Sequence, residues 1–330
     1  MTDISAATGK ALALSLLPGV GPATLRKLAG LPAFEDQSVE ELGALVPALS
    51  KALGVPQAWN GALSQAEEQL ELAQRHAARI LSPMDPEYPV LLAGSKDDPF
   101  ILYVRGLLAP EPSQSVAIIG TRQPTAHGEV IARRITQYFV SMGWSVVSGL
   151  ALGCDAIAHE TAVETKGHTV AVLAHGLHTI APSKHRGLAE AILNAGGALV
   201  SQYPFGREVI PQQFVQRDKT QAGLAQGVVM IQSDLHGGSL HASRAALEYG
   251  RWLAVPYPTE LDRSNGEAKV QANVLLADGR NKDKTELLRL KDEAALSQLI
   301  ILRSKEDYSK CIERRASATG NAIPSQSGFF

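Results

Sequence analysis

Short apolar runs alternate with stretches of helical periodicity through the middle of the chain. The runs are VAIIG, WSVVSGL, HTVAVLAHG, GALVSQ, VVMIQS and WLAVPY. Runs that are apolar at nearly every position and end in Gly or polar residues are typical of strands buried on both faces of a parallel sheet. The spacing between them predicts helices at Gly128–Met142, Asp155–Lys166, Gly187–Ala195 and Ser239–Tyr249. The alternation predicts an α/β fold, an extended Rossmann-like, doubly wound and mostly parallel sheet.

The chain before this region has a helical pattern. Two short apolar-periodic segments flank Pro18-Gly19-Val20-Gly21-Pro22, which is the form of a helix-hairpin-helix in a small all-helical, SAM-like domain. The backbone N–H groups of such a hairpin can bind a DNA phosphate, with Arg26 and Lys27 nearby. Such hairpins also serve as protein contacts. The acidic stretch that follows, 31–74, keeps this alternative open.

Prolines at 83, 86 and 89 break the chain after the helical region, and the last residues are small and polar. We divide the chain into a helical domain (1–80), a linker with a short strand at Ile101–Val104 (81–112), a Rossmann-like domain (113–280), a C-terminal helix (281–315, with the charged stretch Lys282–Ile300) and a disordered tail (316–330).

Composition narrows the class of protein. Of 330 residues, 45% are hydrophobic and 19% charged, as in a globular protein. No apolar run reaches the roughly 20 residues that span a bilayer, and the N-terminus lacks a signal sequence. Two cysteines are too few for a disulfide framework or a zinc site. We therefore expect a cytoplasmic protein without a membrane segment or a metal. The net charge of -2 neither supports nor excludes nucleic acid as a partner.

Small and polar residues follow each predicted strand, where a doubly wound sheet binds its ligands. Glycine lets a phosphate approach the backbone, and the next helix offers free N–H groups. Plain turns in such folds are also rich in glycine, but several such ends at one edge favour a phosphate-bearing ligand. These strand ends are Gly120-Thr121-Arg122, Ser148-Gly149-Leu150, His175-Gly176-Leu177, Ser201-Gln202 and Ser233-Asp234.

Cations and one aromatic residue near these ends are the candidate contacts. Arg122 could bind a phosphate through two N–H groups, or form a surface ion pair. In Gln212–Gln226, interpreted as a basic loop, Arg217 and Lys219 could hold a nucleic-acid backbone. Phe214 could stack on a base or pack in the core. A second basic cluster follows the third of the listed strands, with a solvated surface as its alternative: Lys184, His185 and Arg186.

Two further motifs have a structural and a functional interpretation. Asp155 is placed as the N-cap of its helix, and His159, one turn later, as a buried polar residue. The Gly237-Gly238 turn could hold an anion while Ser239 caps the helix that follows. This segment faintly resembles the signature of nucleotide phosphoribohydrolases but lacks its Pro and its Gly-Thr.

Catalytic signatures are missing from the sequence. It contains no Ser/His/Asp spacing of known form, no Walker lysine and no HExxH. We therefore expect no catalytic residues, no cofactor and no enzymatic activity.

Taken together, the motifs resemble the DprA/Smf family of DNA-processing proteins. In order along the chain they include YPVLL, DDPFILYVRG, VAIIGTRQPTAHG, VVSGLALGCDAIAHETA, GHTVAVLAHGL, GALVSQYPFG, GGSLHASRAALEYGR and LLADG. The resemblance implies homodimerisation, single-stranded DNA bound at the strand ends, and delivery of that strand to the RecA recombinase, typically in natural transformation. It also implies that Arg122 binds phosphate and that Arg217 and Lys219 belong to an Arg-Asn-Arg element.

Departures from the family's pattern cluster at the ligand edge and mark a divergent member. Asp218 replaces the Asn of Arg-Asn-Arg, and Ala181 replaces the Tyr of a Tyr-Pro-x-x-Asn element, whose Asn is here His185. Cys154 stands in the usual Gly-Ile-Asp, and Tyr257 in the usual Val-Pro-Gly.

Three functions follow as hypotheses. The first is a non-enzymatic binder of single-stranded DNA that helps load a recombinase, with contacts from Gly120, Thr121, Arg122, Ser148, Gly149, Lys184, Arg186, Phe214, Arg217, Lys219, Gly237, Gly238 and Ser239. The second is a nucleotide sensor or hydrolase at the same edge, in which Glu248 would also matter. The third is an interaction module of a defence or regulatory complex, with the acidic N-terminal part as its partner surface.

Overall fold

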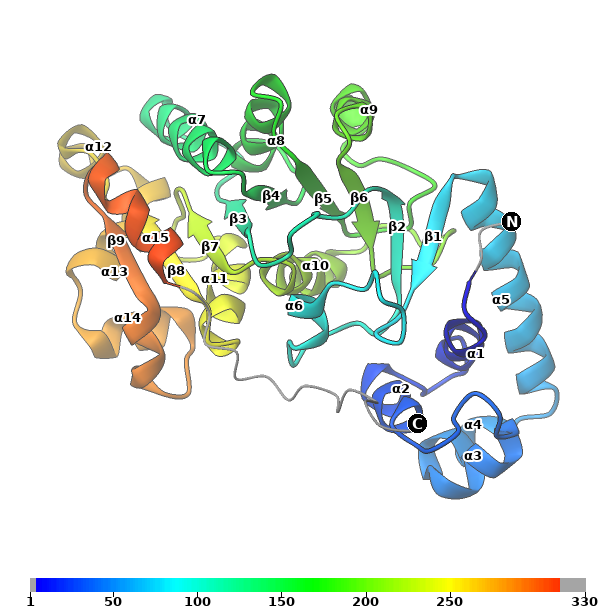
Figure 1. The fold of residues 1–330 in the computed structure, drawn as a ribbon. Coiled ribbons are helices and arrows are strands. Elements are labelled where there is room, and N and C mark those ends of the chain that lie inside the picture. The colour runs from blue at the N-terminus through cyan, green and yellow to red at the C-terminus, as the bar shows by residue number, and fades with distance from the viewer. Residues whose placement is uncertain (1–3, 315–330) are drawn as a thin grey trace, which may run out of the picture.

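The computed structural model describes residues 4–314, and the predicted tail at 316–330 lies outside them. Its centre is a nine-stranded sheet in the order β1-β2-β6-β5-β4-β3-β7-β8-β9 (Figure 1). All neighbours are parallel except β1 with β2 and β2 with β6, so the predicted α/β, mostly parallel fold is confirmed. The strands are β1 (Ala78–Leu81), β2 (Leu102–Gly106), β3 (Ser115–Ile119), β4 (Ser145–Ser148), β5 (Thr169–Leu173), β6 (Ala198–Ser201), β7 (Gly227–Met230), β8 (Trp252–Pro256) and β9 (Leu299–Leu302).

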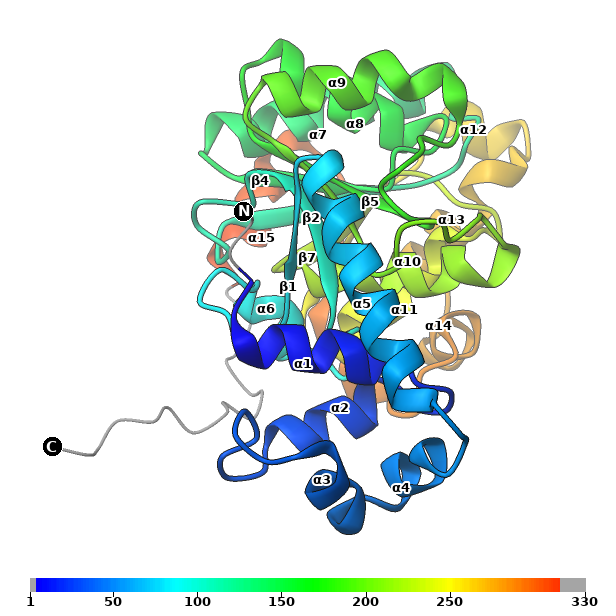
Figure 2. The same cartoon turned by 90° about the vertical axis from the view of Figure 1, so that its right-hand side faces the viewer.

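Helices cover both faces of the sheet, which explains why its central strands are buried at every position. In β3, Val116 and Ile118 pack toward one face, whereas Ala117 and Ile119 pack toward the other. Figures 1 and 2 show α7 (Ala126–Ser141), α8 (Cys154–Glu164) and α9 (Arg186–Asn194) along the upper face. The opposite face carries α6 (Val90–Ala93), α10 (Pro211–Gly223), α11 (Ser239–Glu248), α13 (Gln271–Asp278) and α14 (Asn281–Leu288).

The N-terminal helices pack against the β1 edge of the sheet (Figure 2). They are α1 (Ala6–Ser15), α2 (Pro22–Ala29), α3 (Val39–Leu45), α4 (Pro47–Leu53) and α5 (Ala58–Arg75). The predicted hairpin lies between α1 and α2, where Gly19 has a φ of 81°.

A shared hydrophobic core joins these helices to the sheet. It contains Leu12 and Leu28 of the helices together with Tyr103 of β2 and Leu173 of β5. Only two residues separate α5 from β1, and the first, His76, stacks on Phe205 with ring centroids 5.2 Å apart. The sheet thus begins at Ala78, inside the segment assigned to the helical domain.

The single helix predicted at Lys282–Ile300 is wrong. Helix α14 ends at Leu288, Arg289 has a left-handed φ of 49°, and a 3-10 helix (Glu293–Gln298) leads into β9. The apolar run at the end of this segment pairs in parallel with β8, and this pairing outweighs the helical pattern of the charged residues before it. The remaining short elements are α12 (Glu260–Ser264), α15 (Ser309–Glu313) and the 3-10 helices Ser183–His185, Ala268–Val270 and Lys305–Tyr308.

The segment Gln212–Gln226, interpreted as a loop, is also different: most of it forms helix α10. Its buried side includes polar and charged residues, among them Gln213, Arg217 and Gln221. A helix that buries polar groups has no apolar stripe, so its sequence lacks the usual helical signal.

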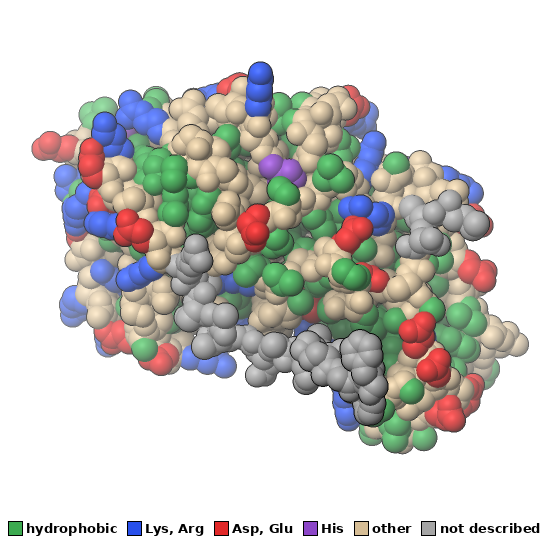
Figure 3. Space-filling model, viewed as in Figure 1, with side chains coloured by type: hydrophobic (Ala, Val, Ile, Leu, Met, Phe, Trp, Pro, Cys, Tyr) green, Lys and Arg blue, Asp and Glu red, His purple; other side chains and the backbone are tan. Residues whose placement is uncertain are grey.

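Charge is unevenly spread over the surface. Figure 3 shows acidic side chains gathered at the lower right, over the N-terminal helices, as the composition of 31–74 predicted. Within residues 4–314, no helix is long and apolar enough to cross a membrane.

Candidate functional site

A cavity of about 310 Å³ opens at the carboxyl ends of β3 and β7. From β3 the chain builds β4, β5 and β6 on one side, and then returns to β7 on the other. This reversal of strand order is where doubly wound sheets bind ligands. The cavity is lined by Ile119, Gly120, Thr121, Arg122, Ala151, Asp155, Phe214, Arg217, Asp218, Gln221, Ser233, Asp234, Gly237, Gly238, Ser239 and Ala242.

Tight backbone packing holds the turns after β3 and β4 together. The backbone N–H of Cys154 donates to the Thr121 carbonyl at 3.1 Å, and Gly153 has a φ of 73°, which favours glycine. A Cβ added at Gly120 would lie 2.6 Å from the Cys154 Sγ. The two turns therefore form one rigid wall of the cavity.

Arg217 reaches the cavity from α10 and is the most deeply buried cation there. Its side chain is 5% exposed, and its Nη1 lies 3.5 Å from Asp155 Oδ2. With its carboxamide oxygen facing these donors, Gln221 accepts from Arg217 Nη1 at 3.1 Å and from the Gly149 N–H at 2.6 Å. A Cβ at Gly149 would lie 1.2 Å from Arg217 Nη1, so the missing side chain of Gly149 makes room for the guanidinium.

Carboxyl groups outnumber cations in this cavity. Asp155, Asp218 and Asp234 line it together with the guanidinium groups of Arg122 and Arg217. Asp218 Oδ1 lies 3.2 Å from Arg217 Nε, but this Nε–H has no hydrogen-bond partner.

Burial shifts the pKa values of two of these carboxyls. It raises the pKa of Asp218 to about 7, because the opposing attraction of Arg217 does not offset the loss of hydration. Burial likewise raises the pKa of Asp155, against the attraction of Arg217. The charge of the cavity therefore changes near neutral pH.

Arg122 and Phe214 form the exposed part of the site. The Arg122 guanidinium lies 5.6 Å from the centroid of the Phe214 ring, and that of Arg217 lies 5.7 Å from it. Arg122 is exposed and has no ion pair within residues 4–314, whereas Phe214 is half-buried. The half-buried ring of Phe214 thus lies close to one exposed and one buried cation.

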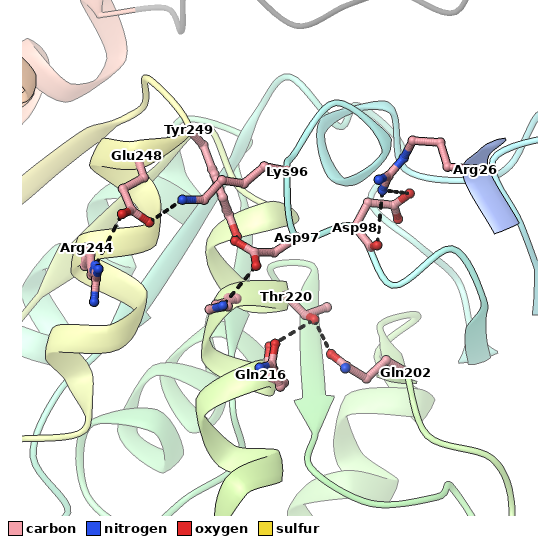
Figure 4. Close-up of polar contacts among 11 residues, drawn as sticks. Arg26, Lys96, Asp97, Asp98, Gln202, Gln216, Thr220, Arg244, Glu248 and Tyr249 are labelled. Atoms are coloured by element: carbon pink, nitrogen blue, oxygen red, sulfur yellow. Dashed lines mark hydrogen bonds and ion pairs between the residues drawn. The ribbon is translucent and has the colours of Figure 1, made fainter. Parts of the chain in front are cut away.

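Lys219 does not line the cavity, because residues two apart on a helix project in different directions. Its ammonium lies 2.9 Å from Asp97 Oδ1. The Tyr249 hydroxyl donates to the other oxygen of this carboxylate, Asp97 Oδ2, at 2.9 Å (Figure 4). In the same loop, Asp98 pairs with Arg26 of α2. The loop around Asp97 thus connects α2, α10 and the end of α11. Its ion pair with Lys219 engages a cation that we assigned to the ligand from the sequence.

Lys184 and Arg186 lie further along the same rim of the sheet. Both are exposed, and neither has an ion pair in the part of the chain that the structure describes. His185, between them, contacts the carbonyl of Leu150, just after β4, through its Nδ1 at 2.8 Å. The two cations therefore lie beside the carboxyl end of β4, outside the cavity.

Two predicted helix caps are wrong. The N-cap of α8 is Gly153, so Asp155 lies in the first turn, where Oδ2 accepts from the Ala151 N–H and pairs with Arg217. The N-cap of α11 is Gly238, and the Ser239 hydroxyl donates to that of Ser233 at 2.8 Å. In both cases the side chain that we expected to cap its helix instead contacts a residue outside that helix.

Other sequence candidates have structural partners. The buried Ser148 hydroxyl donates to the Ile118 carbonyl at 2.6 Å, outside the cavity. His159 is buried, as predicted, and it contacts Thr169 Oγ1 at 2.7 Å. Glu248 pairs with Lys96 and Arg244 at the far end of α11 and does not line the cavity (Figure 4). Within residues 4–314, His, Cys, Asp and Glu side chains form no group that could hold a metal ion.

Comparison with known families decides which of these resemblances holds. Residues 79–281, more than half of the chain, match the family described as DNA recombination-mediator protein A. The chain belongs to this family. The DprA/Smf resemblance of the motifs is thereby confirmed, and the matched segment runs from β1 to the first residue of α14, so that β9 lies outside it.

Curated relatives agree with this assignment. The chain is 38% identical to Protein Smf of Escherichia coli over 188 residues, 56% of this chain and 50% of that protein. It is 34% identical to Protein Smf of Synechocystis over 270 residues, 77% of this chain and 66% of that protein. The matches thus span half to two thirds of these relatives.

Solved structures of the same family share the fold. DNA processing protein A from Streptococcus pneumoniae aligns with a TM-score of 0.61 and 23% identity, over 84% of this chain and 98% of that one. The protein from Helicobacter pylori, described for its single-stranded DNA binding mode, aligns with a TM-score of 0.52 and 28% identity, over 64% of this chain and 95% of that one.

Proposed function

We propose that this protein binds single-stranded DNA along the carboxyl rim of its sheet, with the β3/β7 cavity receiving a phosphate. The observation that carries the proposal is the exposed, unpaired Arg122 beside the half-buried ring of Phe214, at the point where the strand order reverses. A cation next to an aromatic face matches the two groups of a nucleotide, phosphate and base. The single-stranded DNA binding of the Helicobacter pylori relative supports this proposal.

The proposed role of each residue depends on whether its side chain is exposed or buried. Arg122, Lys184 and Arg186 are accessible and neutralise phosphates, whereas Phe214 stacks on a base. Buried Arg217 contacts Asp155 and Gln221 and so holds the wall of the cavity in place. Its guanidinium also adds positive potential inside the cavity. Gly120 and Gly237 permit close packing of the turns, since a Cβ at Gly237 would lie 2.2 Å from Ser233 Oγ. The mechanism is electrostatic and positional, and no covalent step is involved.

Filter binding of matched single- and double-stranded oligonucleotides across a salt series tests the proposal. We expect tighter binding of the single strand, with log affinity falling by about 0.7 per phosphate contact per log unit of salt. Equal affinity for both forms would contradict the stacking of bases on Phe214. Affinity that does not depend on salt would contradict the phosphate contacts.

Replacing Arg122 with Ala is expected to flatten the salt slope of single-strand binding by about 0.7, because one phosphate contact is lost. The matched control is Lys219→Ala, which removes a cation of α10 already paired with Asp97 outside the cavity. We expect this control to leave the salt slope unchanged. A flattened slope in Lys219→Ala with an unchanged slope in Arg122→Ala would reverse our assignment of the two cations.

We further propose that the protein acts in the cytoplasm as a homodimer. We also propose that it passes the bound strand to a RecA-type recombinase, which agrees with the family's description as a DNA recombination mediator. Sedimentation of the full chain, with and without an oligonucleotide, tests dimerisation. Strand exchange by a RecA-type recombinase on DNA coated with single-strand-binding protein tests loading. We expect the protein to shorten the lag of that reaction, and the Arg122→Ala variant to do so less.

A further inference from the structure

A second and larger cavity, of about 1030 Å³, lies at the other end of the same rim. It is formed by α7, by the segment after β8 and by the residues that follow β9. Its volume is at the upper end of the roughly 300–1,000 Å³ typical of small-molecule sites. Nothing in the proposed function uses this cavity.

Cations dominate the charge of this second cavity. Arg134, Arg303 and Lys305 line it against one carboxylate, that of Glu306. Arg134 and Lys305 are exposed and have no ion pair within residues 4–314, whereas Arg303 pairs with Asp278 at 3.3 Å. The β3/β7 cavity, by contrast, has more carboxyls than guanidinium groups. The second cavity is therefore the better match for an anion.

Aromatic rings lie next to these cations. Tyr257 follows β8 directly, and the guanidinium of Arg303 lies 4.1 Å from its ring centroid and that of Arg263 5.0 Å. On the α7 side, Tyr138 and Tyr308 are in edge contact, with centroids 5.3 Å apart. Nucleobases stack both on aromatic rings and on guanidinium planes. The cavity thus offers stacking surfaces within the reach of phosphate-binding cations.

We propose that the second cavity binds a nucleoside phosphate, with its phosphate at Arg134 and Lys305 and its base stacked on the Tyr257–Arg303 platform. The nucleotide can be a free mononucleotide or part of a DNA strand that continues along the rim from Arg122. His127 of this cavity lies only five positions after Arg122 in the sequence. The strand-bound form rests on the proposed function, whereas the free nucleotide does not.

The test is titration of the full chain with adenosine monophosphate by calorimetry and with a 20-nucleotide oligo-dT by fluorescence anisotropy. We expect Arg134→Ala/Lys305→Ala to weaken binding of the mononucleotide at least about tenfold, because two charge-assisted contacts are lost. If the strand reaches the cavity, the double variant should also flatten the oligonucleotide salt slope by about 1.4, for two contacts. Tyr257→Gly should weaken the binding of whichever ligand occupies the second cavity, without changing the salt slope of that binding.

The controls separate this proposal from the proposed function. Lys51→Ala/Arg75→Ala removes two exposed cations from α4 and α5 and should change neither titration. Because the β3/β7 cavity can also take a mononucleotide, both titrations are repeated in the Arg122→Ala background, where Arg134→Ala/Lys305→Ala should still weaken mononucleotide binding. If Arg122→Ala has no effect on the oligonucleotide while the double variant has, the proposed function fails and the second site stands. If Arg134→Ala/Lys305→Ala binds both ligands with the affinity of the unmodified chain, the second site is overturned. The same holds if the double variant differs from the unmodified chain only in its sedimentation coefficient.

Discussion

Replacing Arg217 with Ala is expected to lower the free energy of unfolding by about 3–5 kcal/mol at pH 8, because two carboxyls would remain buried without their cation. Asp155 and Asp218 both lie within 3.5 Å of the guanidinium, and their side chains are 8% and 14% exposed. Urea denaturation followed by circular dichroism measures the loss. The loss should shrink toward pH 5.5, because carboxyls without a cation take up protons more readily.

Arg244→Ala is the matched control. Arg244 lies on α11, next to α10, and forms a partly exposed ion pair with Glu248 of the same helix. Such pairs contribute at most about 1 kcal/mol, so we expect the control to change stability little. If Arg217→Ala were as stable as Arg244→Ala at pH 8, Arg217 would not be the structural cation of the cavity wall.

Replacing Asp218 with Asn is expected to raise the affinity for single-stranded oligonucleotides at pH 8 and to remove most of its pH dependence. The pKa of Asp218 is raised to about 7, so this carboxyl is mainly charged at pH 8 and repels a phosphate near Arg122 and Arg217. Affinity of the unmodified protein should rise as the pH falls from 8 to 6, because protonation removes this charge. Anisotropy titrations at constant ionic strength measure the effect. The substitution also restores the Asn of the family's Arg-Asn-Arg element.

The titration of Asp218 should also make the free energy of unfolding depend on pH. Because the folded-state pKa of Asp218 lies above its unfolded value of 3.8, the folded chain retains a proton that the unfolded chain has lost between about pH 4 and 7. The contribution of Asp218 to the free energy of unfolding therefore falls as the pH rises through this window, and Asp218→Asn should flatten the fall. Asp36→Asn, which removes an exposed charge from the turn between α2 and α3, should change neither stability nor affinity. Parallel pH profiles of Asp218→Asn and the unmodified protein would contradict the assignment.

The sequence predicted the parallel core of the sheet because strands buried on both faces leave a strong signal. VAIIG, HTVAVLAHG and WLAVPY correspond to β3, β5 and β8. Strand β9 was missed because its four residues follow a charged stretch with helical spacing, and only pairing with β8 distinguishes it. Helix α10 was missed because it buries polar side chains.

The candidate site was predictable in its location but not in its internal pairing. The strand-end rule placed Arg122 and the glycine turn at Gly237 at one edge, and both line the β3/β7 cavity. The contacts of Arg217 with Asp155 and of Lys219 with Asp97 join residues far apart in the sequence. Such pairs depend on how α10 is rotated against the sheet, and a single sequence does not encode that rotation in any local pattern.

The join between helix α5 and strand β1 leaves no room for a hinge. Two residues connect them, and His76 is stacked on Phe205 at that point. A domain swings only where a few residues can absorb large backbone rotations, and this junction is filled by core packing. The acidic helices and the strand rim therefore keep a constant separation and angle, so any partner that reaches both must adapt its own shape to the protein's spacing.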